Sequence, residues 1–167
     1  MMLIIEDGAG LPDAESYASV AELVVYAGKF GVTLPVEEAA QEALLRRAAL
    51  VMEGMGWKGS KTSGDQALAW PRRGVELDRE IKPDNHISAR IKCGQMALAA
   101  EIHADDIDPI EQRKGAVTKE KVDGAVEREY ATTSSTSNRL LPAAPDRPSA
   151  TQFADYLLRR GLFAVRV

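Results

Sequence analysis

The residues with the clearest potential for binding chemistry lie in and beside the loop between the two tryptophans, Trp57 and Trp70. In a chain whose net charge is −4, this stretch carries a cluster of cations: Lys58, Lys61, Arg72 and Arg73. Cations beside an aromatic ring could hold a nucleic acid strand, because the cations contact phosphates while the ring stacks on a base. The alternative is that both indoles are buried as anchors and that the charges are simply solvated. We favour the anchor interpretation, because the tryptophans stand next to glycine and proline.

Catalytic and metal-binding patterns are weak. His86 and His103 are too far apart in sequence to form a helical metal pair, and Cys93 is the single cysteine, so no internal disulfide can form. The acidic run at 105–108 lacks the spacing of a calcium-binding loop, and no glycine-rich phosphate-binding motif is present. We therefore expect no enzyme, no metal and no cofactor. The net charge also argues against a surface coated with nucleic acid, and we expect no signal peptide and no membrane-spanning stretch.

The first element expected to support the loop is a helix that begins after Ser19 and stops at Gly31. Ser19 and Glu22 form a capping-box pattern, and Gly31 is a typical helix terminator. We expect Tyr17 and Tyr26 at the margins of this helix. Its expected buried side is Val20, Leu23, Val24 and Ala27.

Two further helices are expected on either side of the tryptophan loop. One begins near Pro35 and ends at Gly54, which delivers Trp57 to the loop. Its expected buried face is Ala40, Ala43, Leu44, Ala48 and Val51. The other runs from about Ser88 to His103 and is closed by an acidic loop at 105–109.

After residue 113 the pattern changes to two short strands around Asp123-Gly124, a strong signal for a hairpin turn. We expect a short helix at Thr151–Arg160 and an apolar, strand-like tail at Leu162–Val167. The predicted organisation is a helical core at 1–113, a β-hairpin arm at 114–131, a polar linker at 132–149 and a helix with its tail at 150–167. The predicted fold is thus a mainly α three- to four-helix bundle with a hairpin arm.

The sequence resembles a family found in tailed bacteriophages and prophages. The resemblance is carried by Ser16-Tyr17-Ala18-Ser19-Val20-Ala21-Glu22, by Trp57-Lys58-Gly59, by Gln66-Ala67-Leu68-Ala69-Trp70-Pro71-Arg72 and by a hairpin like Val122-Asp123-Gly124-Ala125-Val126 leading to Tyr130. It extends from about residue 14 to 131. Such proteins are often labelled DnaT-like single-stranded-DNA-binding proteins, and they are also similar to head–tail connectors.

The resemblance implies a structural role as a head–tail connector, or adaptor. In that family a helical bundle with a hairpin arm assembles into a ring, usually a dodecamer, under the portal protein. The implied partners are other copies of the chain, the portal, the next neck or tail-completion protein, and DNA that passes through transiently or binds non-specifically. The implied locations are the host cytoplasm during assembly and then the virion neck, with no membrane contact. The alternative is a single-stranded-DNA-binding accessory protein of replication, with the tryptophan loop as its contact.

Overall fold

A computed structural model of the chain describes residues 3–108, 117–123, 125–130 and 147–158. Within these ranges the fold is mainly helical, as predicted, with four helices and three two-stranded antiparallel sheets. The helices are α1 (Val20–Phe30), α2 (Glu38–Glu53), α3 (Ala89–Ile107) and α4 (Pro148–Phe153). The strands are β1 (Ser60–Lys61), β2 (Arg72–Arg73), β3 (Glu76–Leu77), β4 (Glu80–Ile81), β5 (Val117–Asp123) and β6 (Ala125–Tyr130). In the part of the chain described, no helix combines the length and apolar character needed to cross a membrane.

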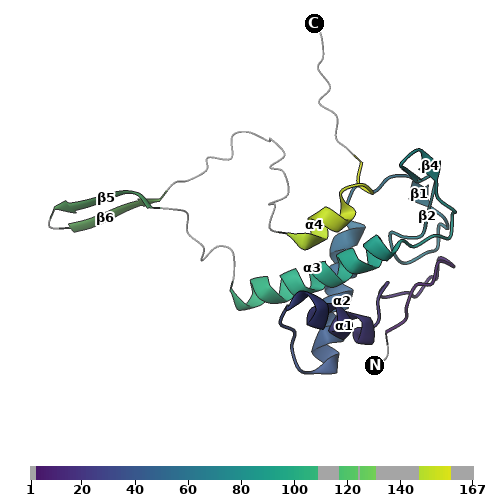
Figure 1. Ribbon diagram of the computed structural model, residues 1–167, viewed down its shortest axis with the longest axis horizontal. Coiled ribbons are helices and arrows are strands. Elements are labelled where there is room, and N and C mark those ends of the chain that lie inside the picture. The colour runs from purple at the N-terminus through teal and green to yellow at the C-terminus, as the bar shows by residue number, and fades with distance from the viewer. Residues whose placement is uncertain (1–2, 109–116, 124, 131–146, 159–167) are drawn as a thin grey trace, which may run out of the picture.

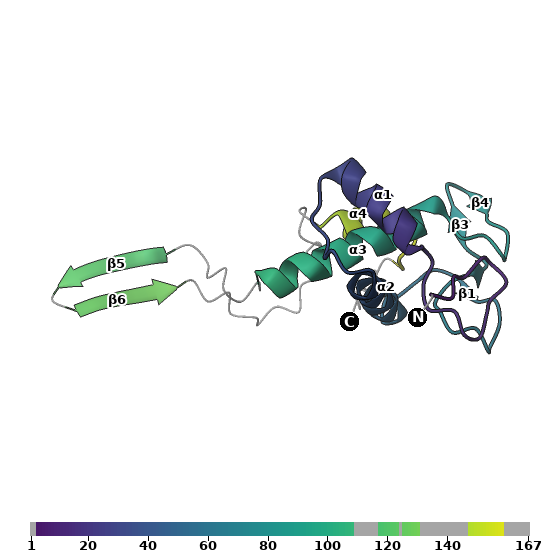
Figure 2. The same ribbon diagram turned by 90° about the horizontal axis from the view of Figure 1, so that it is seen from below.

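Helix α3 is the central element, and each of the other three helices packs against it. Figures 1 and 2 show α3 crossing α2, with α1 and α4 placed against it. Small residues on α3 allow these close approaches. Gly94 faces the fully buried ring of Phe153 from α4, and Ala97, Ala99 and Ala100 are buried as well. Residues 147–158 therefore share one core with the helices of the predicted 1–113 region.

Helix α1 confirms the predicted caps and part of the predicted buried face, since Leu23 and Ala27 are buried and Val20 is half-buried. The Glu22 N–H donates to Ser19 Oγ at 3.2 Å, the Ser19 N–H donates to the Glu22 carboxylate at 2.7 Å, and Gly31 ends the helix with φ of 65°. Tyr17 and Tyr26 are buried instead of marginal, while Val24 is 49% exposed. The helix rests on its neighbours through Leu23, Tyr26 and Ala27. Because these three residues form the buried face, the side chain of Val24 is exposed to solvent.

Helix α2 begins three residues later than predicted, with Glu37 as its N-cap. Pro35 is used differently, since its carbonyl accepts a hydrogen bond from Gln41 Nε2 at 2.7 Å. The predicted face is partly wrong: Leu44 and Ala48 are buried, but Ala43 and Val51 are exposed. The buried residues of the helix are Gln41, Glu42, Leu44, Leu45, Ala48, Ala49 and Met52.

Helix α3 begins after Ser88, as predicted, with Ser88 Oγ accepting the Arg90 N–H at 3.2 Å. It extends beyond His103 to Ile107, so the predicted acidic loop starts too early. The reason lies in tertiary ion pairs. Asp106 accepts two hydrogen bonds from Arg47 of α2, and Asp105 pairs with Arg147 at 2.9 Å. These pairs hold the last turn of α3 in helical form.

The predicted hairpin is present as β5 and β6, which pair antiparallel. The register sets Lys119 opposite Glu129, Glu120 opposite Arg128 and Lys121 opposite Glu127. Residues of opposite charge thus occupy paired positions in this register. Gly124 lies outside the described residues, so the Asp123-Gly124 turn stays a prediction. The same holds for residues 132–146 of the linker predicted at 132–149, whose last two residues instead begin α4, and for the tail at Leu162–Val167.

The C-terminal helix is shorter and lies earlier in the chain than predicted, with Arg147 as N-cap and its last residue at Phe153. Pro148 occupies the first turn, where a missing N–H is tolerated. The chain then continues through Tyr156, which is buried, and Leu157, which bridges to Trp57. Phe153 is therefore buried from the helix, whereas Tyr156 is buried from the turn that follows it.

The Gly94–Phe153 contact predicts a specific sensitivity to added volume. A Cβ at Gly94 would come within 2.1 Å of Phe153 Cε1, so Gly94→Ala should push α4 away from α3 and lower the free energy of unfolding by about 1–3 kcal/mol. Gly28 of α1 is the matched control, since a Cβ there meets no atom within 4 Å. Gly28→Ala should stabilise the protein by about 0.5–1 kcal/mol. Urea unfolding checks both, and equal stability of Gly94→Ala and wild type would contradict the packing described.

Candidate nucleic-acid interface at the tryptophan loop

Both tryptophans of the loop are buried, with Trp57 4% and Trp70 2% exposed. Their rings meet edge to face, with centroids 5.8 Å apart and an interplanar angle of 82°. Phe153 lies edge-on to Trp57 at 5.1 Å, and Tyr156 lies edge-on to Trp70 at 5.6 Å. This geometry is favourable for aromatic pairs. Neither indole presents a face on which a nucleic acid base could stack.

The polar atoms around the two indoles are mostly satisfied from inside the protein. Trp57 Nε1 donates to the Met52 carbonyl at 2.7 Å, and the Trp70 backbone N–H donates to the Tyr17 hydroxyl at 2.9 Å. Burial raises the pKa of Tyr17, so its hydroxyl stays protonated. The Trp70–Pro71 peptide bond is cis. Among the described residues Trp70 Nε1 has no hydrogen-bond partner.

Gln66 closes the loop from within. Its Nε2 donates to the carbonyls of Leu68 and Pro71 at 2.7 and 3.0 Å, and its Oε1 accepts the Ser63 N–H at 2.9 Å. Leu68 is buried beside it. The Gln-x-Leu-x-Trp-Pro-Arg sequence therefore has a structural explanation: one amide holds both ends of a tight turn.

Arg72 is committed to the fold as well. Its guanidinium donates to the carbonyls of Lys58 at 2.8 Å, Gly59 at 2.8 Å and Ala69 at 3.1 Å. Burial lowers the pKa of Arg72, although an arginine remains charged at neutral pH. The guanidinium N–H groups of Arg72 thus donate to three carbonyls of the loop. A phosphate contact would have to compete with these bonds.

Gly59 is required by the pairing of β1 with β2. Its φ is +69°, and a Cβ at this position would lie 2.3 Å from the Arg73 carbonyl oxygen. A larger residue would clash with the neighbouring strand and would be strained in this backbone region. Gly59 therefore allows the close approach on which the Arg72 hydrogen bonds depend.

The other three predicted cations divide into paired and unpaired groups. Lys61 Nζ lies 3.0 Å from a Glu53 carboxylate oxygen, whereas Lys58 Nζ reaches only the Glu76 carbonyl at 3.4 Å. Arg73 is exposed and has no ion pair within the described residues. Of the predicted group of four, Lys58 and Arg73 are thus the two that have neither a carboxylate partner nor a set of loop carbonyls around the charge among the described residues. Contact of any of the four with a ligand stays a prediction.

The structure adds Arg79, which the sequence analysis missed. Residues 76–81 form the β3–β4 hairpin, with Asp78 and Arg79 at positive φ of 52° and 67°. A tight turn with positive φ normally carries glycine or asparagine, so Asp78-Arg79 does not stand out as a turn in the sequence. Arg79 is exposed, and among the described residues it has no ion pair.

Lys58 and Arg79 share a polar hollow of about 460 Å³ beside the loop. Gly59 and Gly74 contribute backbone to it, while Glu76 and Asp78 bring carboxylates. Residues 57–82 hold six cations and four carboxylates, so this end of the molecule is cationic while the whole chain is acidic. An anion would meet favourable but mixed electrostatics here, which predicts weak, salt-sensitive contacts.

Two buried polar residues that the sequence analysis missed hold the surroundings in place. The Glu6 carboxylate accepts the backbone N–H groups of Gly8, Gly10 and Leu11 at 2.7–2.9 Å, and the Leu11 carbonyl then accepts the Ala67 N–H. Gln95 of α3 accepts the N–H groups of Tyr17 and Ala18 and donates to the Leu45 carbonyl. Both side chains are fully buried. The partners of Glu6 named here are 2 to 5 residues away in sequence, whereas those of Gln95 are 50 to 78 residues away. The role of Gln95 therefore cannot be predicted from neighbouring residues.

One family matches the chain over residues 1–167, under the description "Putative DnaT-like ssDNA binding protein". The chain belongs to this family. No curated protein and no solved structure matches it. The family description agrees with the alternative drawn from the sequence, and no match points to a head–tail connector.

The neighbours Arg72 and Arg73 provide a matched test of the loop. Arg72→Ala should lower the free energy of unfolding by about 1–3 kcal/mol, because three carbonyls lose a charged donor. Arg73→Ala removes the same charge from an exposed side chain and should change stability by less than about 0.5 kcal/mol. Urea unfolding of the two variants checks the difference. Similar losses for both would contradict the assignment of Arg72 to the fold.

Proposed function

We propose that this protein binds single-stranded DNA through the sugar–phosphate backbone, at the cationic edge formed by Lys58, Arg73 and Arg79. The observation that carries the proposal is that Lys58 and Arg79 line one hollow beside the loop, with Arg73 exposed on the adjoining strand β2. Among the described residues, none of the three has a carboxylate partner. The family description supports the ligand class. The proposed role is binding, with no catalytic step.

Buried indoles determine the kind of binding that we propose. Bases gain affinity by stacking on exposed aromatic rings, but Trp57 and Trp70 offer no exposed ring at this edge. Affinity then comes from phosphate contacts alone, so it is independent of sequence and falls with salt. Glu76 and Asp78 beside the cations keep it modest.

Binding of a fluorescein-labelled oligothymidylate, followed by anisotropy across a salt series, tests this proposal. Each phosphate contact on a single strand contributes about 0.7 to the slope of log K against log salt, so the Lys58→Ala/Arg73→Ala/Arg79→Ala variant should lose about 2 from the slope. Lys29→Ala is the control, since Lys29 is exposed on α1, away from the loop. An unchanged slope in the triple variant would overturn the site.

Tryptophan fluorescence supplies an independent readout for the same proposal. Since both indoles are buried, saturating oligothymidylate should leave their emission nearly unchanged in the wild-type protein. Strong quenching would show that a base stacks on a tryptophan, which the proposed phosphate-only contact does not allow.

We also propose, as a second candidate, that the chain is the head–tail connector that the sequence resemblance implies. The observation that favours an assembly role is the exposed apolar surface of α1, where Val24, Val25 and Phe30 are 49%, 55% and 63% exposed. Surfaces of this kind mark protein contacts more often than nucleic acid contacts. Closed rings in negative-stain electron microscopy, with or without a portal ring as template, would support this candidate. Particles no larger than single subunits under both conditions would exclude it.

A further inference from the structure

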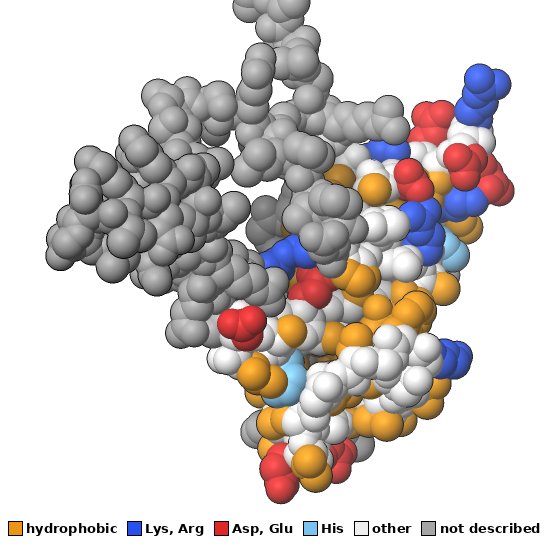
Figure 3. All heavy atoms as spheres, turned by 60° about the vertical axis from the view of Figure 1, so that its left-hand side comes forward, with side chains coloured by type: hydrophobic (Ala, Val, Ile, Leu, Met, Phe, Trp, Pro, Cys, Tyr) orange, Lys and Arg blue, Asp and Glu red, His pale blue; other side chains and the backbone are white. Residues whose placement is uncertain are grey.

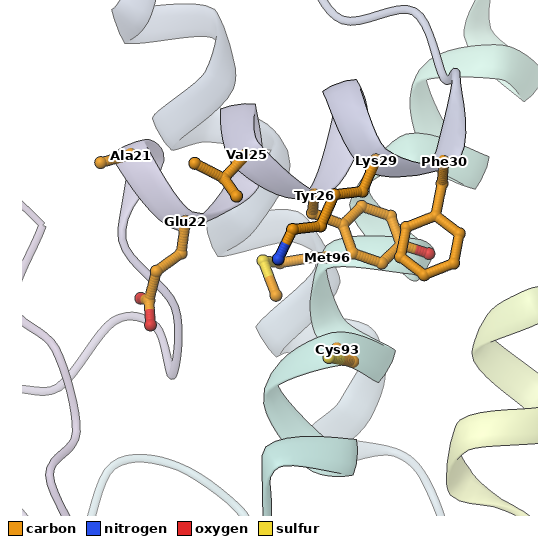
Figure 4. A pocket seen from close by; sticks show the side chains of 8 residues that line it. All are labelled: Ala21, Glu22, Val25, Tyr26, Lys29, Phe30, Cys93 and Met96. Atoms are coloured by element: carbon orange, nitrogen blue, oxygen red, sulfur yellow. The ribbon is translucent and has the colours of Figure 1, made fainter.

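An apolar groove runs between α1 and α3, and we call it the α1–α3 groove. Its volume is about 530 Å³, and its apolar walls are Val25, Tyr26, Phe30, Cys93 and Met96. Figure 4 shows Tyr26 and Phe30 side by side over α3, with Cys93 below them. Their ring centroids are 4.4 Å apart. Tyr26 also lines a second hollow of about 390 Å³, which continues past Ala97 and Ala104 to Pro148 at the start of α4.

The groove has the character of a protein-binding surface. Among the described residues, the charged side chains at its walls are Glu22 and Lys29, whose charges cancel, so these walls offer no net attraction to a phosphate backbone. Figure 3 shows hydrophobic side chains spread over the lower half of the body, the end at which α1 lies in Figure 1. Apolar surface of this extent carries a cost in water that a docked apolar segment would remove.

The chain itself contains a segment of matching chemistry, Leu162–Val167. Its sequence, Leu-Phe-Ala-Val-Arg-Val, has five apolar residues and one charge. Phe163, Val165 and Val167 alternate with the others, so an extended conformation would place them on one face. This segment lies outside the described residues. The other occupant with comparable chemistry is a second copy of α1 itself.

The attachment point of the segment favours a neighbouring copy over its own groove. The Leu158 N–H donates to the Gly56 carbonyl at 2.8 Å, and Leu157 bridges to Trp57, so the described chain ends beside the tryptophan loop. A chain advances at most about 3.6 Å per residue, so the four residues between Leu158 and the start of the segment can extend at most about 14 Å. Figure 1 shows α1 across α3 from α4 and the residues that follow it.

We propose that Leu162–Val167 of one copy docks in the α1–α3 groove of a second copy. This inference goes beyond DNA binding and rests on different residues. A segment of one copy in a groove of the next is a heterologous contact, which builds closed rings or open chains according to the angle between copies. The groove and the segment are thus two halves of one head-to-tail interface.

Cys93 provides a direct readout, because the only thiol of the chain lines the groove. A thiol covered by a docked segment is out of reach of an alkylating reagent. The alkylation rate of Cys93 in the wild-type protein should therefore fall at least about tenfold as the protein concentration is raised through the range in which sedimentation velocity shows association. Phe163→Asp should keep Cys93 reactive at every concentration and stay monomeric. Val36→Asp is the control, because Val36 is 95% exposed but lies outside the groove, and it should behave as wild type.

Complementation decides the geometry of the interface. Val25→Asp changes an exposed groove residue, so it should remain folded by circular dichroism yet monomeric alone. When the two variants are mixed, the intact Leu162–Val167 segment of Val25→Asp can dock in the intact groove of Phe163→Asp. The mixture should therefore form a dimer and nothing larger. Association of Phe163→Asp by itself would overturn the proposal in favour of α1 packing on α1. Concentration-independent protection of Cys93 in monomeric wild type would overturn it in favour of docking within one chain.

Discussion

Edge-to-face packing of four aromatic rings holds this fold together. Trp57 and Trp70 come from the two ends of the loop, while Phe153 and Tyr156 come from the segment that includes α4. Their contacts fasten the loop to the helices and bring residues 147–158 back onto α3, about 60 residues after that helix began. Much of the apolar burial at this end of a molecule with few aromatic residues depends on these rings.

Anchoring the rings has a direct consequence for ligand binding. An indole that supports the core cannot also serve as a stacking platform, and the guanidinium of Arg72 is likewise used to hold loop carbonyls. What remains for a ligand is the rim of the loop, where Lys58 and Arg79 share a hollow with Glu76 and Asp78, and Arg73 is exposed on the adjoining strand. Such a rim suits transient contact with a flexible polyanion, because its attraction is weak, non-directional and screened by salt.

The molecule thus presents two surfaces of opposite character. The loop end is charged and polar, whereas the α1 side is apolar around Phe30 and Val25. The chemistry of the first fits nucleic acid and that of the second fits protein. A protein with both could gather on a strand through many weak sites joined by contacts between copies, since linked weak sites bind far more tightly than one alone.

Local sequence determined the features whose causes lie within a few residues: the Ser19–Glu22 capping box, the Ser88 cap and the pairing of β5 with β6. Tertiary structure alone decided which helix face is buried, because Tyr26 and Val24 are both apolar and only the position of α3 separates them. It also distinguished Arg72 from Arg73, which are adjacent and chemically identical. The pairing of residues 60–61 with 72–73 places the carbonyls of Lys58 and Gly59 at the guanidinium of Arg72. The same pairing leaves the side chain of Arg73 exposed to solvent. The two tryptophans could therefore be located from the sequence, but the side of their loop that meets a ligand required the fold.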